Sequence, residues 1–540
     1  MLITIASLLG FTLFVAAVSY YVTRNDKMTS SDAYFLGGRK LTAWVIAGSL
    51  MLTNLSTEHL IGLNGDAFKH TIAVMAWETT AALAMVLTAL YFLPKYLKSG
   101  FATIPHFLSE RYDKNTSTIA TILFLASYVI AILPVVLLFG ATGIESLLDV
   151  SDNLGISRSQ AIVLLVWGVG TLGSLYAIFG GLRAVAVSDT VNGVGFLIAG
   201  LMIPALALLA IGDGDMLAGL AEVYNEEHDK FDITGNEPGS FLPFGVLFTG
   251  MIVNQIFFWC TNQSIVQRAL GAKSLAEGQK GVLIAAGFKL IGPFIIVLPG
   301  VIAFHMFKDT LAPDDYLMAY PMLVKAVLPP ALVGFFAAVV IGAVLSTFNS
   351  VLNSSAALFS QGIYQGIFNK QATGKQIVLS GRVVSIILAL AAMIAAPMID
   401  TEGSLYNYLQ KINATFFGPM LAVIILGFVS KRASATAAKI GLIAGPILFY
   451  LLVFVFGESV QELLKGLFGV VDDIHFLHLL AFVFVLTVLV MLAVSWIRPA
   501  DKIYVQTQTQ DVDVTPWKYA KHTGAVISGI TVLFYILLAQ

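Results

Sequence analysis

The sequence is poor in cysteine and in charge. Its 540 residues include one cysteine, Cys260, so an internal disulfide is excluded. Charged residues make up 11% of the chain, against roughly 25% in soluble domains, whereas 58% of the residues are hydrophobic and the mean hydropathy is +0.86. The net charge of -2 offers no basic excess that would attract nucleic acid. This composition predicts a protein that crosses a membrane many times.

Linkers are also scarce. The chain has no Ser/Gly-rich or low-complexity tract and no polar stretch long enough for a soluble domain, so residues 1–540 are expected to form a single membrane domain. A crossing helix needs about 20 apolar residues, and such runs predict an all-α fold with about fourteen spans and a polar connector at 501–517. The predicted spans are 2–22, 41–66, 71–95, 117–148, 160–180, 188–211, 242–263, 281–307, 330–363, 376–398, 404–429, 434–457, 474–497 and 520–539.

Basic residues are unevenly distributed between alternate loops. With the N-terminus outside, 22 of the 30 Lys and Arg residues fall on the inner side and six on the outer side. We therefore expect a multi-pass protein of the plasma membrane, such as a bacterial inner membrane, with both termini outside. The first span lacks a basic leading region and a small-residue cleavage site, so we interpret it as a retained helix rather than a signal peptide.

Two of the predicted spans carry a dense polar interruption. The second span contains TNLSTEH at 53–59, and the seventh, five spans later, contains VNQIFFWCTNQ at 253–263. Such interruptions in corresponding positions of two halves indicate broken helices around a transporter's binding site near mid-membrane. We therefore expect two five-helix repeats of opposite orientation, 41–211 and 242–430. An extra N-terminal helix, 1–22, and three C-terminal helices, 434–540, would flank them.

Several polar side chains within the spans have both a packing and a binding interpretation. Asn54, Glu58 and His59 form either a helix-packing network or part of an unwound, ligand-binding segment. Glu78 lies roughly 10 Å deep, where it is either an interfacial acid or a binding group. Lys289 lies roughly 13 Å deep and either extends to the interface or binds a ligand. A carboxylate and an ammonium group near mid-membrane suit a hydroxyl-rich ligand.

A sodium site is a further possibility in the ninth span. Ser346 and Thr347 are adjacent hydroxyls that either bond back to their own helix or coordinate a cation. Two hydroxyls and the carbonyls of an unwound helix suit a small hard cation without burying a full negative charge. Asp189, at the inner end of the sixth span, either pairs with Arg183 or attracts sodium towards the inner exit.

Five sequence blocks carry a resemblance to a known family. They are YFLGGRKL (34–41), SLMLTNLSTEHLIG (49–62), ATIPHFLSERYDK (102–114), YAIFGGLRAVAVSDTVNG (176–193) and FWCTNQSIVQRALGAKSLAEGQKG (258–281). In these blocks the chain resembles the sodium/solute symporter family, and within it the sugar branch with its bacterial sodium/galactose symporters. The resemblance covers roughly 30–440. It implies the inverted-repeat fold of the leucine transporter, with flanking helices, and sodium-driven solute uptake by alternating access.

The resemblance also implies functional residues, position by position. Sugar contacts are expected from Asn54, Glu58, His59, Glu78, Gln255, Lys289 and Gln410. The sodium ion would bind the backbone oxygens of Leu52, Leu55 and Ala343 and the hydroxyls of Ser346 and Thr347. Asp189 matches the acidic residue on the family's inner sodium path. Sodium and a sugar are thus the expected ligands and the lipid bilayer the surroundings, and no obligate protein partner is indicated.

Three positions depart from the galactose symporters of this branch. Phe258 replaces a tyrosine that stacks on the sugar as an inner gate, which keeps the aromatic face but loses a hydroxyl. Ala81 replaces a sugar-contacting serine, and Ile132 replaces an asparagine. Because a missing buried hydrogen-bond partner costs about 1–3 kcal/mol, these changes predict a preference for a different epimer or a deoxy sugar.

Other functions compete with sodium-coupled uptake of a sugar such as galactose or glucose. The nearest alternative keeps the fold and changes the cargo to an amino acid, sialic acid, nucleoside or small carboxylate. An anionic cargo would require a deep cation, yet no Arg is expected deep in a core span, which leaves only Lys289. A membrane sensor is less favoured because no kinase follows. An enzyme is least favoured, since no nucleophile or metal cluster accompanies Glu58 and His59.

Overall fold

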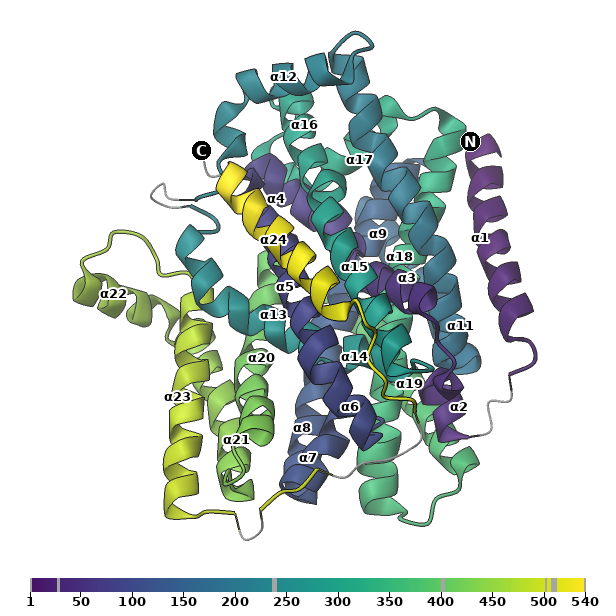
Figure 1. Cartoon of the computed structure of the whole chain (residues 1–540). Coiled ribbons are helices and arrows are strands. Elements are labelled where there is room, and N and C mark those ends of the chain that lie inside the picture. Colours follow the sequence, from purple (N-terminus) through teal and green to yellow (C-terminus); the bar gives the residue numbers. More distant parts are fainter. Residues whose placement is uncertain are drawn as a thin grey trace.

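The computed structural model describes residues 2–26, 30–235, 240–399, 404–500, 503–506 and 512–538. These residues fold into one bundle of helices (Figure 1). The β-pairing within the described ranges consists of two isolated bridges, Leu41 with Ala272 and Ser274 with Asp513. The first bridge joins the first residue of the second predicted span to the chain between the seventh and eighth predicted spans. The fold is therefore all-α, as predicted.

Eleven helical stretches among the described residues are long and apolar enough to cross a membrane. They are α1 (Leu2–Thr23), η3 to α6 (Ile72–Ser99), α8 to α9 (Lys114–Leu148), α11 (Arg158–Ile211), α15 to α16 (Leu275–Phe307), α18 to η9 (Pro330–Phe368), α19 to η10 (Gly374–Met398), α20 (Leu405–Val429), α21 to η11 (Ala435–Val455), α23 (Phe476–Ile497) and α24 (Ala520–Leu538). Ten of the fourteen predicted spans correspond one to one with ten of these stretches.

The eleventh stretch, α11, combines two predicted spans. At 1.5 Å per residue its 54 residues would extend about 80 Å, far more than the roughly 30 Å of a bilayer core. The helix is interrupted at Gly181, whose φ of 61° and ψ of -178° are readily adopted only by glycine. The predicted spans 160–180 and 188–211 are therefore the two helical halves on either side of this glycine, with no loop between them.

The second and seventh predicted spans are broken helices, as expected from their polar interruptions. In the second, α3 (Ala43–Asn54) ends before an unwound turn, and the chain continues as a π-helical segment, η2 (Glu58–Leu63), and α4 (Asn64–Lys69). In the seventh, α13 (Gly250–Cys260) ends before α14 (Gln263–Leu270). The Asn262 side chain between them accepts a hydrogen bond from the Ser264 amide and so begins the new helix. Side chains of Asn, Ser and Thr favour such breaks because they compete for backbone hydrogen bonds.

The broken helices lie at the centre of the bundle. The α3 helix packs on α11 and α15, α18 packs on α11 and α1, and α13 packs on α5 (Ala76–Leu87) and α20. The α20, α21 and α23 helices form a separate group on one side, and α24 lies across α5 and α15 (Figure 1). The remaining α-helices in the described ranges are α2 (Ser31–Phe35), α6 (Leu93–Ser99), α7 (Ile104–Arg111), α8 (Lys114–Ser127), α9 (Leu133–Leu148), α10 (Val150–Leu154), α12 (Met216–Glu226), α15 (Leu275–Ile296), α16 (Leu298–Phe307), α17 (Ala319–Val327), α18 (Pro330–Ala357), α19 (Gly374–Ala395) and α22 (Gly457–Phe468).

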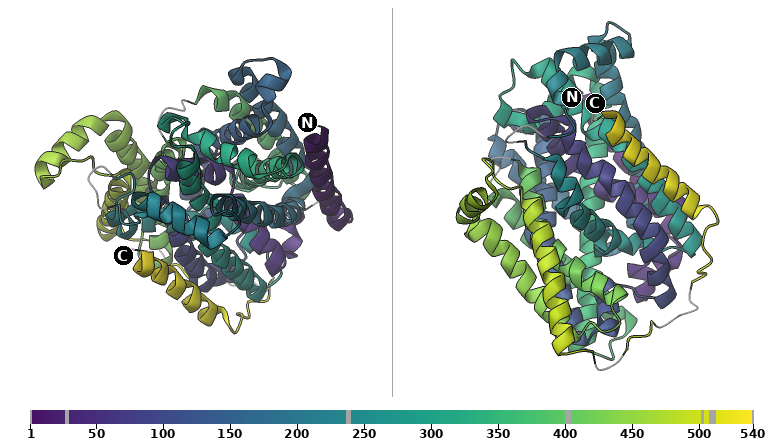
Figure 2. Two further views of the ribbon diagram at one scale, coloured as in Figure 1. Left: turned by 90° about the horizontal axis from the view of Figure 1, so that it is seen from above. Right: turned by 60° about the vertical axis from the view of Figure 1, so that its left-hand side comes forward.

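One end of the bundle carries α12, and α1 begins and α24 ends towards this same end (Figures 1 and 2). Which side of the membrane it faces stays a prediction from loop charge, as do the repeat boundaries 41–211 and 242–430. Of the connector predicted at 501–517, residues 501–502 and 507–511 lie outside the described ranges. The described part contacts α6 and α15, because Gln506 donates to the Lys95 carbonyl (2.8 Å) and the Trp517 amide donates to Gln279 (2.8 Å).

Candidate functional site

A buried cavity of about 50 Å³ lies where the two broken helices meet α5, α18 and α20. Ligand pockets are commonly about 300 Å³ or more, so the surrounding helices must move apart before a solute of that size enters. The cavity is lined by Thr53, Asn54, Glu58, His59, Trp77, Glu78, Ile132, Asn254, Gln255, Phe258, Trp259, Ser264, Ile265, Thr347, Val351, Tyr406, Leu409, Gln410 and Asn413.

Most of the side chains predicted to bind the solute meet at this cavity. Asn54, Glu58, His59, Glu78, Gln255 and Gln410 all line it, and so does Phe258, the predicted gate. Of the three positions that depart from the galactose symporters, Phe258 and Ile132 line the cavity, whereas Ala81 is buried elsewhere. Ala81 is therefore not a direct cause of any difference in specificity in this arrangement.

Lys289 lies behind the cavity wall rather than in it. Its Nζ is 2.6 Å from Glu78 Oε2, it also donates to Asn54 Oδ1, and it lies 5.1 Å from the centre of the Trp259 ring. Both Lys289 and Glu78 are 1% exposed, so the interfacial interpretations of these two residues are wrong. The lysine orients two cavity-lining side chains and balances the charge of one of them.

His59 is held between two carboxylates and an aromatic pair. Its Nε2 lies 3.4 Å from Glu78 Oε1 and 3.5 Å from the Tyr406 hydroxyl, and its Nδ1 lies 3.7 Å from Glu58 Oε1. The Tyr406 ring packs edge-on against both His59 (5.4 Å between ring centres) and Trp77 (5.7 Å). These rings place the histidine at the cavity surface and limit its rotation.

Gln255 connects the second broken helix to α5. Its Nε2 donates to the Trp77 carbonyl (2.7 Å) and to the Thr80 hydroxyl (3.2 Å). The carbonyl that accepts this bond is that of the residue just before Glu78. Any movement of α13 relative to α5 therefore acts on the same stretch that carries the buried carboxylate.

Four polar atoms in side chains that line the cavity are buried without a hydrogen-bond partner among the described residues. They are Glu58 Oε2, His59 Nδ1, Asn254 Oδ1 and Asn413 Oδ1. A buried polar atom without a partner costs about 1–3 kcal/mol, so their concentration here indicates a surface built to bind polar groups. Three of the four are oxygens, which accept hydrogen bonds from a donor.

Other cavity-lining residues were missed in the sequence analysis. Asn254 immediately precedes Gln255, and Asn413 lies three residues after Gln410 on α20, so helical spacing is a signal that would have identified it. No sequence signal of this kind marks Trp77 or Tyr406 as a cavity-lining residue. An aromatic residue in an apolar span resembles any other core residue until the partner helices are placed.

The side chains predicted to bind sodium lie between the break in α3 and the middle of α18. The Thr347 hydroxyl donates to the Thr53 carbonyl (2.8 Å), the Ser56 hydroxyl donates to the Ala343 carbonyl (3.3 Å), and the Ser346 and Thr53 hydroxyl oxygens are 3.5 Å apart. Leu52 and Leu55 are buried on the same break. The predicted donor set is thus neutral and all oxygen, which fits a monovalent hard cation.

Asp189 lies deeper than predicted and does not pair with Arg183. Arg183 instead pairs with Asp26. Asp189 Oδ2 accepts a hydrogen bond from the Ser49 hydroxyl (2.6 Å) and lies 3.9 Å from Arg268 Nη2, whose Nε also donates to Ser49 (2.9 Å). The acid therefore belongs to a buried network that links α3, α11 and α14.

Arg268 departs from a second expectation, namely that no arginine lies deep in a core span. The side chain is fully buried because α14, the second half of the seventh span's broken helix, packs on α3 and α18. Arg268 also donates to the Ser264 carbonyl and the Ser350 hydroxyl, so several groups share its charge. It does not line the cavity.

Two broken helices around a central polar cavity define the class of secondary transporters. The chain matches the family model of the sodium:solute symporter family over residues 34–445. It is 44% identical over 534 residues (99% of this chain, 90% of the relative) to "Uncharacterized symporter YidK" of Escherichia coli K12. The chain belongs to the sodium:solute symporter family.

Two further relatives have names that state the solute they transport. The chain is 31% identical over 460 residues (80% of this chain, 82% of the relative) to a sodium/glucose cotransporter of Vibrio parahaemolyticus. It is 30% identical over 542 residues (94% of this chain, 78% of the relative) to sodium/myo-inositol cotransporter 2 of Bos taurus.

A solved structure confirms the predicted fold. A sodium-coupled sialic acid symporter in an outward-open state superposes with a TM-score of 0.76 at 19% identity, covering 93% of this chain and 99% of the other. The fold is that of the leucine-transporter type, and the family and fold are those of transporters rather than enzymes.

Proposed function

We propose that the protein takes up a neutral sugar or a related polyol by sodium symport, alternating between outward-facing and inward-facing states. Galactose and glucose are the first candidates. The named solutes of the relatives, glucose and myo-inositol, support this class because both are uncharged and rich in hydroxyl groups. An inward sodium gradient would supply the driving force.

The observation that carries the proposal is the group of unpaired acceptors around the cavity. Glu58 Oε2, Asn254 Oδ1 and Asn413 Oδ1 come from three different elements and are buried without partners among the described residues. Hydroxyl groups on different carbons of a sugar ring would donate to oxygens placed in this way. The aromatic face of Phe258 suits the apolar face of the same ring, as expected for the gate.

The charges around the cavity favour a neutral solute over an anion. None of the described residues that line the cavity is Lys or Arg. The nearby buried cations already form ion pairs. Lys289 pairs with Glu78, and Arg268 pairs with Asp189 and also contacts neighbouring oxygens. A carboxylate solute such as sialic acid would therefore meet Glu58 without a free cation to offset the repulsion.

Sodium would act at the contact between α3 and α18. We propose the carbonyls of Leu52, Leu55 and Ala343 and the hydroxyls of Ser346 and Thr347 as its ligands. An ion there would hold the break in α3, which also carries Asn54 and Glu58, against α18. Sodium and solute would then each raise the affinity for the other. We propose that Asp189 lies on the inner path by which sodium leaves.

Uptake into liposomes tests the function directly. The purified protein is reconstituted, and uptake of radiolabelled galactose and glucose is measured with an inward sodium gradient or with potassium in its place. Unlabelled myo-inositol, fucose and sialic acid serve as competitors. Sodium-stimulated uptake that is blocked by neutral polyols supports the proposal. Competition by sialic acid alone, or uptake that is independent of sodium, would overturn it.

A further inference from the structure

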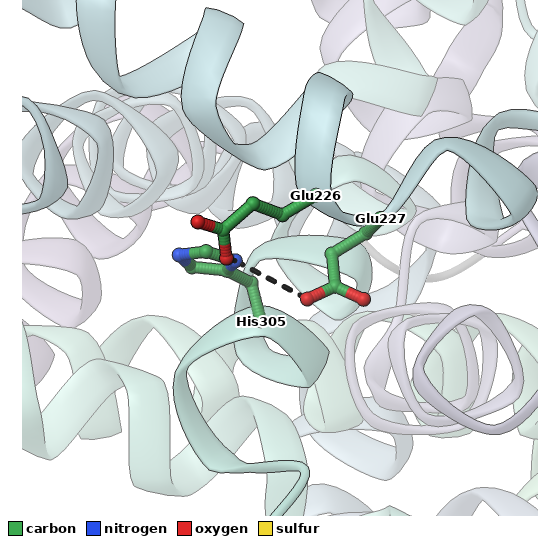
Figure 3. A group of neighbouring side chains, drawn as sticks. All are labelled: Glu226, Glu227 and His305. Carbon is green, nitrogen blue, oxygen red and sulfur yellow. Dashed lines mark hydrogen bonds and ion pairs between the residues drawn. The ribbon is translucent and has the colours of Figure 1, made fainter.

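A cluster of carboxylates and one histidine lies outside the transport site, where the end of α12 meets α16. Glu226 is the last residue of α12, Glu227 follows it, and His305 lies near the end of α16. Figure 3 shows both glutamate side chains pointing from the α12 end towards the His305 ring. Their ligand atoms all lie within 4.8 Å of one another.

The spacing of these atoms fits a single small metal ion. His305 Nδ1 lies 3.3 Å from Glu227 Oε1 and 3.6 Å from Glu226 Oε2. A tetrahedral Zn²⁺ ion with bonds of about 2.0–2.2 Å holds its ligand atoms about 3.3–3.6 Å apart. The two carboxylate oxygens lie within 4.8 Å of each other, so rotation of the glutamate side chains would complete three corners of one coordination sphere.

The other nitrogen of the histidine also faces a carboxylate. His305 Nε2 lies 3.9 Å from Glu222 Oε1, one turn earlier on α12. In zinc sites the ring nitrogen that does not bind the metal commonly donates to a carboxylate, which fixes the tautomer and the ring orientation. The exposed Glu222 side chain needs to move by less than about 1 Å to come within hydrogen-bond distance and fill this positioning role.

We propose that Glu226, Glu227 and His305 form a binding site for a divalent transition-metal ion of the Zn²⁺ type, with Glu222 as the positioning residue for His305. One imidazole and two carboxylates suit zinc and its neighbours. Calcium prefers six to eight oxygen ligands, and Mg²⁺ keeps several waters and takes few protein carboxylates, so neither matches this set. The exposed Glu226 leaves room for water as a fourth ligand.

Lys308 is the natural competitor for the metal. Its Nζ lies 2.5 Å from Glu227 Oε1, the same oxygen that faces His305. A lysine ammonium group is charged at neutral pH, so it competes with a cation for this carboxylate. Metal binding requires this flexible, partly exposed side chain to give up the oxygen. Removal of Lys308 should therefore strengthen metal binding.

An ion at this site would join α12 to the centre of the bundle. The α16 helix packs closely on α4, because a Cβ at Gly300 would lie 2.1 Å from the Asn64 carbonyl oxygen. The metal would thus link α12, through α16, to the second half of the first broken helix. Binding should raise the thermal stability of the full chain, independently of which solute is transported.

The test uses the full-length protein in detergent without a polyhistidine tag. Zn²⁺ binding is measured by calorimetry, and Co²⁺ serves as a visible probe of the coordination sphere. We expect one equivalent of metal and a higher melting temperature with Zn²⁺. His305→Ala and Glu226→Gln should each lower the affinity by about tenfold or more, at least as much as loss of an outer-shell partner. Lys308→Ala should raise the affinity.

His228→Ala is the matched control, because His228 is an exposed histidine near the end of α12 and outside the cluster. It should bind the metal like the unaltered protein. Each variant is first checked for its melting temperature without metal. If His305→Ala does not fold, the exposed Glu226→Gln decides the question. No binding by the unaltered protein, or equal binding by Glu226→Gln, would overturn the site.

Discussion

Lys289 Nζ and Glu78 Oε2 lie 2.6 Å apart, and their side chains are 2% and 1% exposed. The lysine comes from α15 and the glutamate from α5, so the pair joins two helices that are far apart in sequence. A buried ion pair is retained only if hydrogen bonds offset the cost of desolvation. Here Lys289 also donates to Asn54, and Glu78 lies against His59. The pair orders the cavity wall and offsets the charge of Glu78.

Breaking this pair from one side should be costly. Lys289→Met would leave the Glu78 carboxylate buried without its cation, and we expect a loss of about 3–5 kcal/mol of unfolding free energy. The double variant Lys289→Met with Glu78→Gln should recover most of it. Melting temperatures in detergent measure both. The exposed pair Lys69 and Asp314 (2.9 Å) is the control, since Lys69→Met should cost about 0–1 kcal/mol. Equal losses in the two single variants would contradict this prediction.

Thr347→Ala should weaken the sodium dependence of uptake. The change removes one proposed hydroxyl ligand and the hydrogen bond from Thr347 to the Thr53 carbonyl. A net loss near 1 kcal/mol corresponds to a roughly five- to tenfold higher sodium concentration for half-maximal uptake. The control is Thr487→Ala on α23, where the buried hydroxyl donates to the Val483 carbonyl of its own helix and lies outside the proposed sodium site. Unchanged sodium activation in Thr347→Ala would count against the site.

Phe258→Tyr should change the order of preference among sugars. The phenol group adds a hydrogen-bonding hydroxyl at the cavity while the ring keeps its position beside Trp259, 5.4 Å between centres. A hydrogen bond of about 0.5–1.5 kcal/mol changes relative affinity by about two- to tenfold. Competition between galactose, glucose and fucose for uptake measures the order. Phe417→Tyr adds a hydroxyl to a ring that does not line the cavity and should leave the order unchanged.

The buried His70 side chain should make the folded protein less stable in acid. Its ring stacks on Phe241 at 4.1 Å, and burial, reinforced by Lys69 and Lys230, lowers its pKa to about 4. Between pH 6.5 and 4 the unfolded chain therefore binds a proton that the folded chain does not, so stability falls as the pH falls through this window. His70→Phe keeps the stacking and removes the titration. Its melting temperature should drop less between pH 7 and 4.5 than that of the unaltered protein. The exposed His228→Phe should drop as much as the unaltered protein.

Much of the site could be predicted because polar side chains in an apolar span are conspicuous. Asn54, Glu58, His59 and Gln255 stand out in this way, and the structure brings all four to one cavity. The role of Lys289 could not be predicted, because depth along a helix does not tell whether a side chain faces a cavity or another helix. The burial of Arg268 could not be predicted for a related reason, since the short polar helix α14 resembles a loop in hydropathy although it packs on α3 and α18.

The membrane class, the all-α fold and the places where two helices break follow from the amino-acid sequence alone, because hydropathy and competition for backbone hydrogen bonds act over a few neighbouring residues. Which polar atoms remain without partners depends on how the helices pack, since partners such as Tyr406 for His59 or Arg268 for Asp189 come from distant helices. The same is true of the cluster of Glu226, Glu227 and His305, whose members lie almost 80 residues apart and meet only when α12 packs over α16.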